Sequence, residues 1–188
     1  MSLGCDCACA YQIKKYQQNL TYPFDWIKSD NIKMICDSLD SKFSIFFDNY
    51  HIVEQSDNFN NFDNFDNFDN LDKNEKDTKS RLRIKLKNNM ILPHESEGFI
   101  FNELKYKEKY QRRINRFYDV VSNEKIKKIF IRCDNKQVKQ SDKEMLITSL
   151  NNYGCVNYEI RYVTYTDYMC IGEFKWKRDY IDWGNIFI

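Results

Sequence analysis

The sequence predicts an α/β fold in which helices cover both faces of a mostly parallel central sheet, giving three layers (α/β/α). Strand-like and helix-like patterns alternate along most of the chain, and the run Ile129-Phe130-Ile131 is typical of a buried strand. With 188 residues, 42% of them hydrophobic, the chain is long enough for one domain with a sizeable core. We therefore expect a single domain over residues 1–188.

The first quarter of the chain predicts a short strand and two helices. Residues 2–4 resemble the end of a strand, and Asp6 suits the N-cap of a helix that runs to about residue 16. Residues 19–26 form a loop around Pro23. A second helix, capped by Ser29 or Asp30, carries apolar residues at helical spacing, and residues 46–53 favour a short strand.

Residues 56–80 differ sharply from the rest. The triplet Asn-Phe-Asp repeats there and is followed by a charged run, a low-complexity composition that buries little apolar surface. We expect a flexible insertion between two structured halves. The repeated Asp residues lack the glycine and closing Glu of an EF-hand, so calcium binding is disfavoured.

Further patterns follow the insertion. The alternation in residues 81–86 predicts a half-buried strand, and residues 90–95 a second short element. Residues 101–123 have helical periodicity with a basic outer face. The remaining chain predicts a strand at 127–133, a helix at 143–151 and strands at 158–165 and 169–176.

Composition excludes several classes of protein. A net charge of +1 gives no indication of nucleic-acid binding. The sequence contains no run of 18 or more apolar residues, so no membrane span is predicted. No signal peptide is recognisable, and an odd count of 7 cysteines fits a reducing compartment, so we expect a cytoplasmic protein. No cofactor is predicted.

The segment Cys5-Asp-Cys7-Ala-Cys9 places thiols where a strand turns into a helix. Free N–H groups and the helix dipole favour an anion in the first turn, which lowers a thiol pKa and can stabilise an oxyanion. Asp6 opposes a thiolate if its carboxylate lies close. No second Cys/His pair completes a zinc site, so we predict no metal. Packing roles for all three cysteines stay an alternative.

The motifs together resemble the putative papain-like cysteine peptidase family (DUF1796). The resemblance covers residues 2–132, apart from the insertion, and is looser beyond. It is carried by Ser2-Leu3-Gly4 with Cys7, Tyr22-Pro23-Phe24-Asp25-Trp26, Leu92-Pro93-His94-Glu95, the helix segment Arg112-Arg113-Ile114-Asn115-Arg116-Phe117, and the strand Ile129-Phe130-Ile131-Arg132.

The resemblance implies that Cys7 is the nucleophile and His94 its partner. A thiol nucleophile needs a base, and the other histidine, His51, lies in an aromatic stretch that favours a structural role. Glu95 stands where the family has Asp, which leaves the third member open. Asp25 either orients His94, as in a triad, or anchors the loop around Pro23.

Three further residues are candidates for substrate binding. Arg132 ends a buried strand, where α/β sheets place their ligands, and Arg113 lies on the basic helix. Trp26 would form a pocket wall.

We therefore expect a thiol-dependent hydrolase or acyl transferase whose substrate is a peptide or an anionic small molecule. Two alternatives stay open: a catalytically inactive binding protein on the same scaffold, and an α/β enzyme that handles a phosphate ligand. The family name implies an α+β fold, an alternative to the predicted architecture. The family's similarity to proteins of large DNA viruses adds host cytoplasm or virion as locations.

Overall fold

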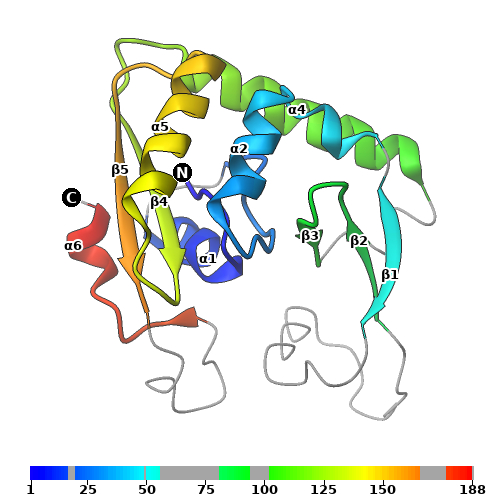
Figure 1. Ribbon diagram of the computed structural model, residues 1–188, viewed down its shortest axis with the longest axis horizontal. Helices are drawn as coiled ribbons and strands as arrows, with labels where there is room; N and C mark the ends of the chain where they lie inside the picture. Colours follow the sequence, from blue (N-terminus) through cyan, green and yellow to red (C-terminus); the bar gives the residue numbers. More distant parts are fainter. Residues whose placement is uncertain (17–19, 49, 56–80, 94–101, 166–176, 188) are drawn as a thin grey trace.

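The computed structural model describes residues 1–16, 20–48, 50–55, 81–93, 102–165 and 177–187 (Figure 1). Helices and strands are mixed along the chain, which confirms the α/β class. In chain order the elements are α1 (Cys7–Tyr16), α2 (Ile32–Asp40), the 3₁₀ helix η1 (Ser44–Phe46), β1 (His51–Gln55), β2 (Arg81–Lys85), β3 (Ile91–Leu92), α4 (Glu103–Val121), β4 (Lys128–Asp134), α5 (Gln140–Tyr153), β5 (Tyr158–Thr164) and α6 (Trp183–Phe187).

The prediction of a mostly parallel central sheet was wrong. The strands of the described residues form an antiparallel three-stranded sheet, β1-β2-β3, and a parallel pair, β4-β5. A tight turn joins β2 to β3, closed by the Leu86 N–H donating to the Met90 carbonyl at 2.8 Å. Strands joined by such a turn must run antiparallel. Hydrophobic alternation marks a strand but does not set its direction.

The N-terminal segment lies between the two sheets, bonded directly to β4 and connected to β3 through residues 28–29. The Leu3 N–H donates to the Ile131 carbonyl of β4 at 2.9 Å, in a parallel bridge. On its other side the Cys5 carbonyl accepts the Ser29 N–H at 3.0 Å, and neighbouring Lys28 exchanges two backbone hydrogen bonds with β3, at 2.8 and 2.9 Å. Backbone hydrogen bonds therefore lead from one sheet to the other through residues 3–5 and 28–29.

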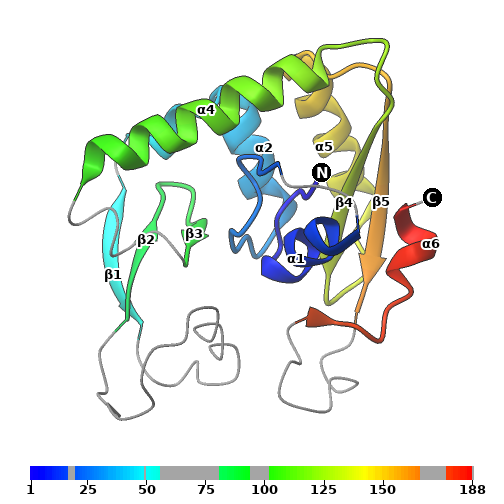
Figure 2. The same ribbon diagram turned by 180° about the vertical axis from the view of Figure 1, so that it is seen from behind.

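Helices cover both faces of the β4-β5 pair. Figures 1 and 2 show α2 and α5 on one face, and α1 and α6 on the other. Side chains alternate along β4 accordingly: Phe130 lies in the larger buried cluster with α2, α4 and α5, whereas Ile131 and Cys133 lie in a smaller cluster with Cys9 and Trp183. The smaller cluster fixes α1 and α6 against the sheet.

Several boundaries differ from the sequence prediction. The cap of α2 is Asn31, whose side chain accepts the Met34 N–H at 3.1 Å, and not Ser29 or Asp30. The stretch 46–53 divides into the end of η1 and the start of β1, and α5 is longer than predicted. Helix α6 was not anticipated.

Two predicted features lie outside the described residues, namely the insertion at 56–80 and the strand at 169–176. The single domain stays a prediction. Within the described part of the chain, no helix is long and apolar enough to cross a membrane.

Candidate active site

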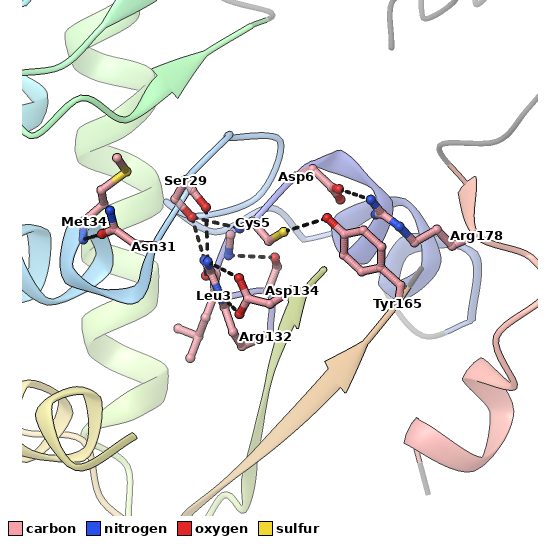
Figure 3. Close-up of polar contacts among 12 residues, drawn as sticks. Leu3, Cys5, Asp6, Ser29, Asn31, Met34, Arg132, Asp134, Tyr165 and Arg178 are labelled. Atoms are coloured by element: carbon pink, nitrogen blue, oxygen red, sulfur yellow. Dashed lines mark hydrogen bonds and ion pairs between the residues drawn. The ribbon is translucent and has the colours of Figure 1, made fainter. Parts of the chain in front are cut away.

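The candidate site lies where the parallel strands end. The N-terminal segment, β4 and β5 run in the same direction, so Cys5, Asp134 and Tyr165 meet at one edge. The Tyr165 N–H donates to the Asp134 carbonyl at 3.0 Å, and the Cys5 thiol lies 3.4 Å from the Tyr165 hydroxyl (Figure 3). Carboxyl ends of parallel strands are the usual ligand edge of an α/β sheet.

A tight turn carries the chain from this strand into α1. Gly4 and Cys5 both have left-handed backbone angles, with φ of 72° and 82°. A β-carbon on Gly4 would lie 2.6 Å from the Ser29 hydroxyl, so only glycine fits there. The strained Cys5 backbone is held because its N–H donates to the same hydroxyl at 2.9 Å. Strain of this kind in a non-glycine residue occurs at functional sites.

Cys7 is the first residue of α1, the position predicted to favour a thiolate. One oxygen of the Asp6 carboxylate caps this helix by accepting the Ala8 N–H at 2.9 Å. The Cys7 side chain is only 4% exposed. The sequence therefore places Cys7 at the helix start, as expected, but in a nearly closed environment.

Two of the neighbouring thiols, Cys5 and Cys133, are held in their neutral form. Burial, and then Asp6, raises the pKa of Cys5 to about 12. Cys9 is fully buried and donates to the Ile131 carbonyl at 3.7 Å. Contact with the Cys9 thiol, together with burial, raises the pKa of Cys133 well above its ordinary value. Cys5 and Cys133 are therefore poor nucleophiles at neutral pH, because the thiolate is the reactive form.

Asp6 has a second partner that comes from far along the chain. Its other oxygen lies 2.5 Å from the guanidinium of Arg178, which is 2% exposed. The same guanidinium lies 3.4 Å above the ring of Tyr165, a cation–π contact (Figure 3). The carboxylate next to Cys7 is thus paired with a buried cation.

Arg132, predicted to bind substrate, uses all its N–H groups within the protein. Its side chain is fully buried, and its Nε and Nη2 donate to the Asp134 carboxylate at 2.8 and 2.7 Å. The remaining donors bond the Leu3 carbonyl at 3.1 Å and the Ser29 hydroxyl and carbonyl at 2.6 and 3.1 Å (Figure 3). A guanidinium has five N–H donors, so none remains for a ligand in this arrangement.

Asp25 lies in a different environment from Cys7. Its carboxylate accepts the Tyr22 N–H at 2.7 Å, and the Asp25 N–H in turn donates to the Tyr22 carbonyl at 3.2 Å. Burial raises the pKa of Asp25 to about 6, although the Tyr22 N–H and the charge of Arg113 oppose this. These contacts favour the loop-anchor interpretation of Asp25.

The two other predicted substrate-binding residues flank this loop. Arg113 on α4 lies 5.1 Å from the centre of the Tyr110 ring, and its electrostatic partner is Asp25. Trp26 is half-buried and has a left-handed backbone, with φ of 63°. The contacts described for Arg113 connect it to Asp25 rather than to Cys7.

His94 lies outside the described residues, as does Glu95. The chain is described up to Pro93, just after β3, and the Pro93 carbonyl accepts a hydrogen bond from Arg83 at 2.7 Å. Among the described residues, no group of three His, Cys, Asp or Glu side chains could hold a metal ion.

Comparison with known proteins places the chain in a family. The sequence model of the family described as "Putative papain-like cysteine peptidase (DUF1796)" matches residues 1–167, most of the chain. The chain belongs to the DUF1796 family. It is also similar to an uncharacterised protein of Acanthamoeba polyphaga mimivirus, with 29% identity over 84% of this chain and 74% of the relative. No solved structure matches.

The family match extends beyond residue 132, where the sequence resemblance had become loose. Four residues around the candidate site of this DUF1796 chain were not predicted from the sequence: Ser29, Asp134, Tyr165 and Arg178. Ser29 had a recognisable sequence pattern around it, but this pattern predicted a helix cap and not a site residue. No sequence pattern pointed to Arg178, because the residues around it have no helical or strand periodicity and lie after the matched residues 1–167.

Proposed function

We propose that this chain is a thiol-dependent hydrolase or acyl transferase in which Cys7 is the nucleophile and His94 the proton carrier. The Cys7 sulfur attacks a carbonyl carbon and expels the leaving group, to which His94 gives a proton. A thioester remains, and water or another acceptor then takes the acyl group. The observation that carries this proposal is the place of Cys7, in the first turn of α1 at the carboxyl edge of the parallel strands.

The environment of the neighbouring thiols supports the choice of Cys7. Cys5 precedes the helix, and its pKa is raised to about 12 by burial and by Asp6. Cys9 lies two residues further into α1, fully buried against β4. Cys7 alone of the three occupies the first helical position, where N–H groups and the dipole favour a thiolate.

The position of β3 supports His94. Lys28 is bonded to Ile91 of β3, and its neighbour Ser29 is bonded to Cys5. Strands in a sheet are about 4.8 Å apart, so β3 lies about two such spacings from the turn that carries Cys7. His94 follows the end of β3 by only two residues in the sequence, and this short separation supports a place for His94 near Cys7.

The contacts also narrow the choice of oxyanion donors. The N–H groups of Gly4, Cys5 and Ala8 already donate, to Ser2, Ser29 and Asp6 respectively. We infer that the Asp6 N–H, from the same turn, is a candidate donor to an oxyanion.

The proposed role of Arg132 changes from substrate recognition to positioning. Because all five of its donors are engaged, we infer that it fixes Leu3 and Ser29, and through them the turn before Cys7. A peptide or an anionic small molecule remains the proposed class of substrate.

Alkylation kinetics test the proposal without a known substrate. We expect iodoacetamide to label Cys7 faster than Cys5 at neutral pH, with fragment mass spectrometry resolving the two sites. Cys5 is the more exposed of the pair, so accessibility works against this result and only thiolate character explains it. His94→Ala should slow labelling of Cys7 and leave Cys5 unchanged.

Two outcomes contradict the proposal. If Cys7 reacts no faster than Cys5, its thiol is not activated, and a binding protein without turnover becomes the better interpretation. If Cys7 is faster but His94→Ala has no effect, the helix start alone accounts for its reactivity and no catalytic pair exists.

A further inference from the structure

Arg178 is a residue to which no role has been assigned, and its guanidinium is paired with Asp6, the residue before the proposed nucleophile. We propose that Arg178 is a positioning residue that offsets the charge of the Asp6 carboxylate and so allows Cys7 to form a thiolate. This inference rests on the proposed function. It assigns a role in the site to residues 177–187, which follow the stretch matched by the DUF1796 family.

The need for such a residue follows from the sequence order. Asp6 directly precedes Cys7 and caps α1 through the Ala8 N–H. A carboxylate is a good helix cap, but its negative charge disfavours a second negative charge on the next residue. The cap and the nucleophile are therefore in electrostatic conflict, unless a cation lies close to the carboxylate.

Arg178 provides that cation at short range. Its Nη2 lies 2.5 Å from the Asp6 carboxylate, with the arginine side chain 2% exposed and the aspartate side chain 22% exposed. Burial weakens the competition from water and salt, so the pair interacts more strongly than a surface ion pair. Tyr165, whose ring lies 3.4 Å from the guanidinium, orients it from the other side.

Residues 177–187 are fixed to α1 and to each other, so that Arg178 is held in place. Gln12 of α1 is fully buried and donates to the Lys177 carbonyl at 2.6 Å and to Asp179 at 2.9 Å. The Trp183 indole, 1% exposed, donates to the Arg178 carbonyl at 2.8 Å. The residues on both sides of Arg178 are therefore tied to α1, the helix that Cys7 begins.

The charged and titratable groups at this corner come from several elements. The groups that interact electrostatically with one another in and around the turn before Cys7 are Cys5 and Asp6 from the turn, Cys9 from α1, Arg132, Cys133 and Asp134 from β4, Tyr165 after β5, and Arg178. Arg132 is paired with Asp134 at 2.7 Å, so these two charges offset each other. The remaining pair, Asp6 with Arg178, is the one adjacent to the nucleophile.

The test is the pH profile of Cys7 alkylation by iodoacetamide in the full chain. We expect Arg178→Met to move the midpoint of the profile upward by about one pH unit and to slow labelling at neutral pH about tenfold. Asp6→Asn keeps a good helix cap but removes the charge, and should move the midpoint downward. The double variant should return close to wild type, because the charge that Arg178 offsets is gone. Arg178→Lys should keep most of the effect.

A merely structural role for Arg178 predicts a different pattern. In that case the midpoints of the pH profile would be displaced equally in Arg178→Met and in the double variant, and this result would overturn the proposal. An unchanged midpoint in Arg178→Met would overturn it as well. If Arg178→Met does not fold, Asp6→Asn still decides, because an unmoved or raised midpoint contradicts the argument. Failure of the proposed function is separate: it appears as the absence of a His94 effect in the wild-type background.

Discussion

Replacing Arg132 by Met tests whether this residue holds the framework or binds substrate. Methionine keeps much of the stem volume and removes every donor. The buried carbonyls of Leu3 and Ser29 would then lose the Arg132 donor, and the Ser29 hydroxyl would lose one of its two donors but would still accept the Cys5 N–H. Asp134, whose side chain is 18% exposed, would lose its bidentate partner but can be hydrated in part.

The expected cost is large. A buried acceptor left without a donor costs about 1–3 kcal/mol, and removing one partner of a buried ion pair costs about 3–5 kcal/mol. These contributions overlap, since they come from one side chain, so we expect a total of about 3–5 kcal/mol. For a chain of this size each kcal/mol corresponds to about 2–4 °C, so the melting temperature should fall by about 6–20 °C.

The measurement is urea denaturation followed by circular dichroism, with Arg112→Ala as the control. Arg112 is exposed on α4, and its replacement should change the stability by no more than about 0.5 kcal/mol. A loss below about 1 kcal/mol in Arg132→Met would refute the reasoning. A stably folded variant that loses only the ability to process a substrate would restore the ligand-binding role.

Three further predictions concern the same framework. Gly4→Ala should destabilise the fold by about 1–3 kcal/mol, measured by thermal melting, because its φ is 72° and the new methyl group would displace the Ser29 hydroxyl; an unchanged melting temperature contradicts this. The pKa of Asp25 is raised to about 6 in the fold, so its contribution to stability is present at low pH and is lost as pH rises from about 4 through 6. The free energy of unfolding of wild type relative to Asp25→Asn should therefore fall by roughly 2 kcal/mol over that range in urea titrations, and a constant difference would show that Asp25 does not titrate there. Deleting residues 57–79 should leave the melting temperature nearly unchanged, because loop-closure entropy varies slowly with length, whereas a loss of several kcal/mol would show that the insertion packs on the core.

Local patterns predicted most helices and strands but not their arrangement. The alternation in β2 and the apolar run in β4 each marked a strand, because period-two burial is a property of the strand itself. Strand direction depends on which segments meet in three dimensions, and here the turn between β2 and β3 decided it. Helix α6 was missed because its 5 residues are too few to show a helical period.

The candidate site likewise contains residues whose positions follow from local sequence and residues whose roles depend on distant contacts. The position of Cys7 at the start of α1 could be predicted because it depends on a local pattern, whereas its role as a nucleophile stays a prediction. The roles of Ser29 and Arg178 depend on contacts across 103 and more than 160 residues of sequence, which no local pattern encodes. Arg132 was recognised as a site residue, but a sequence cannot show that its donors are already used.

The distant motifs of this DUF1796 chain are connected by direct contacts. Arg132, which ends the strand motif, donates to the Leu3 carbonyl of the N-terminal motif at 3.1 Å. Arg116 of the helix motif donates to the Thr21 carbonyl at 2.8 Å, just before the loop that carries Asp25. These charged and polar residues therefore form a framework of hydrogen bonds within the protein, and they are not separate ligand-binding groups. The framework fixes the path of residues 2–6, and α1 therefore starts with Cys7 at the edge of the sheet. Substitutions in the framework should for this reason alter the reactivity of Cys7 without changing the thiol itself.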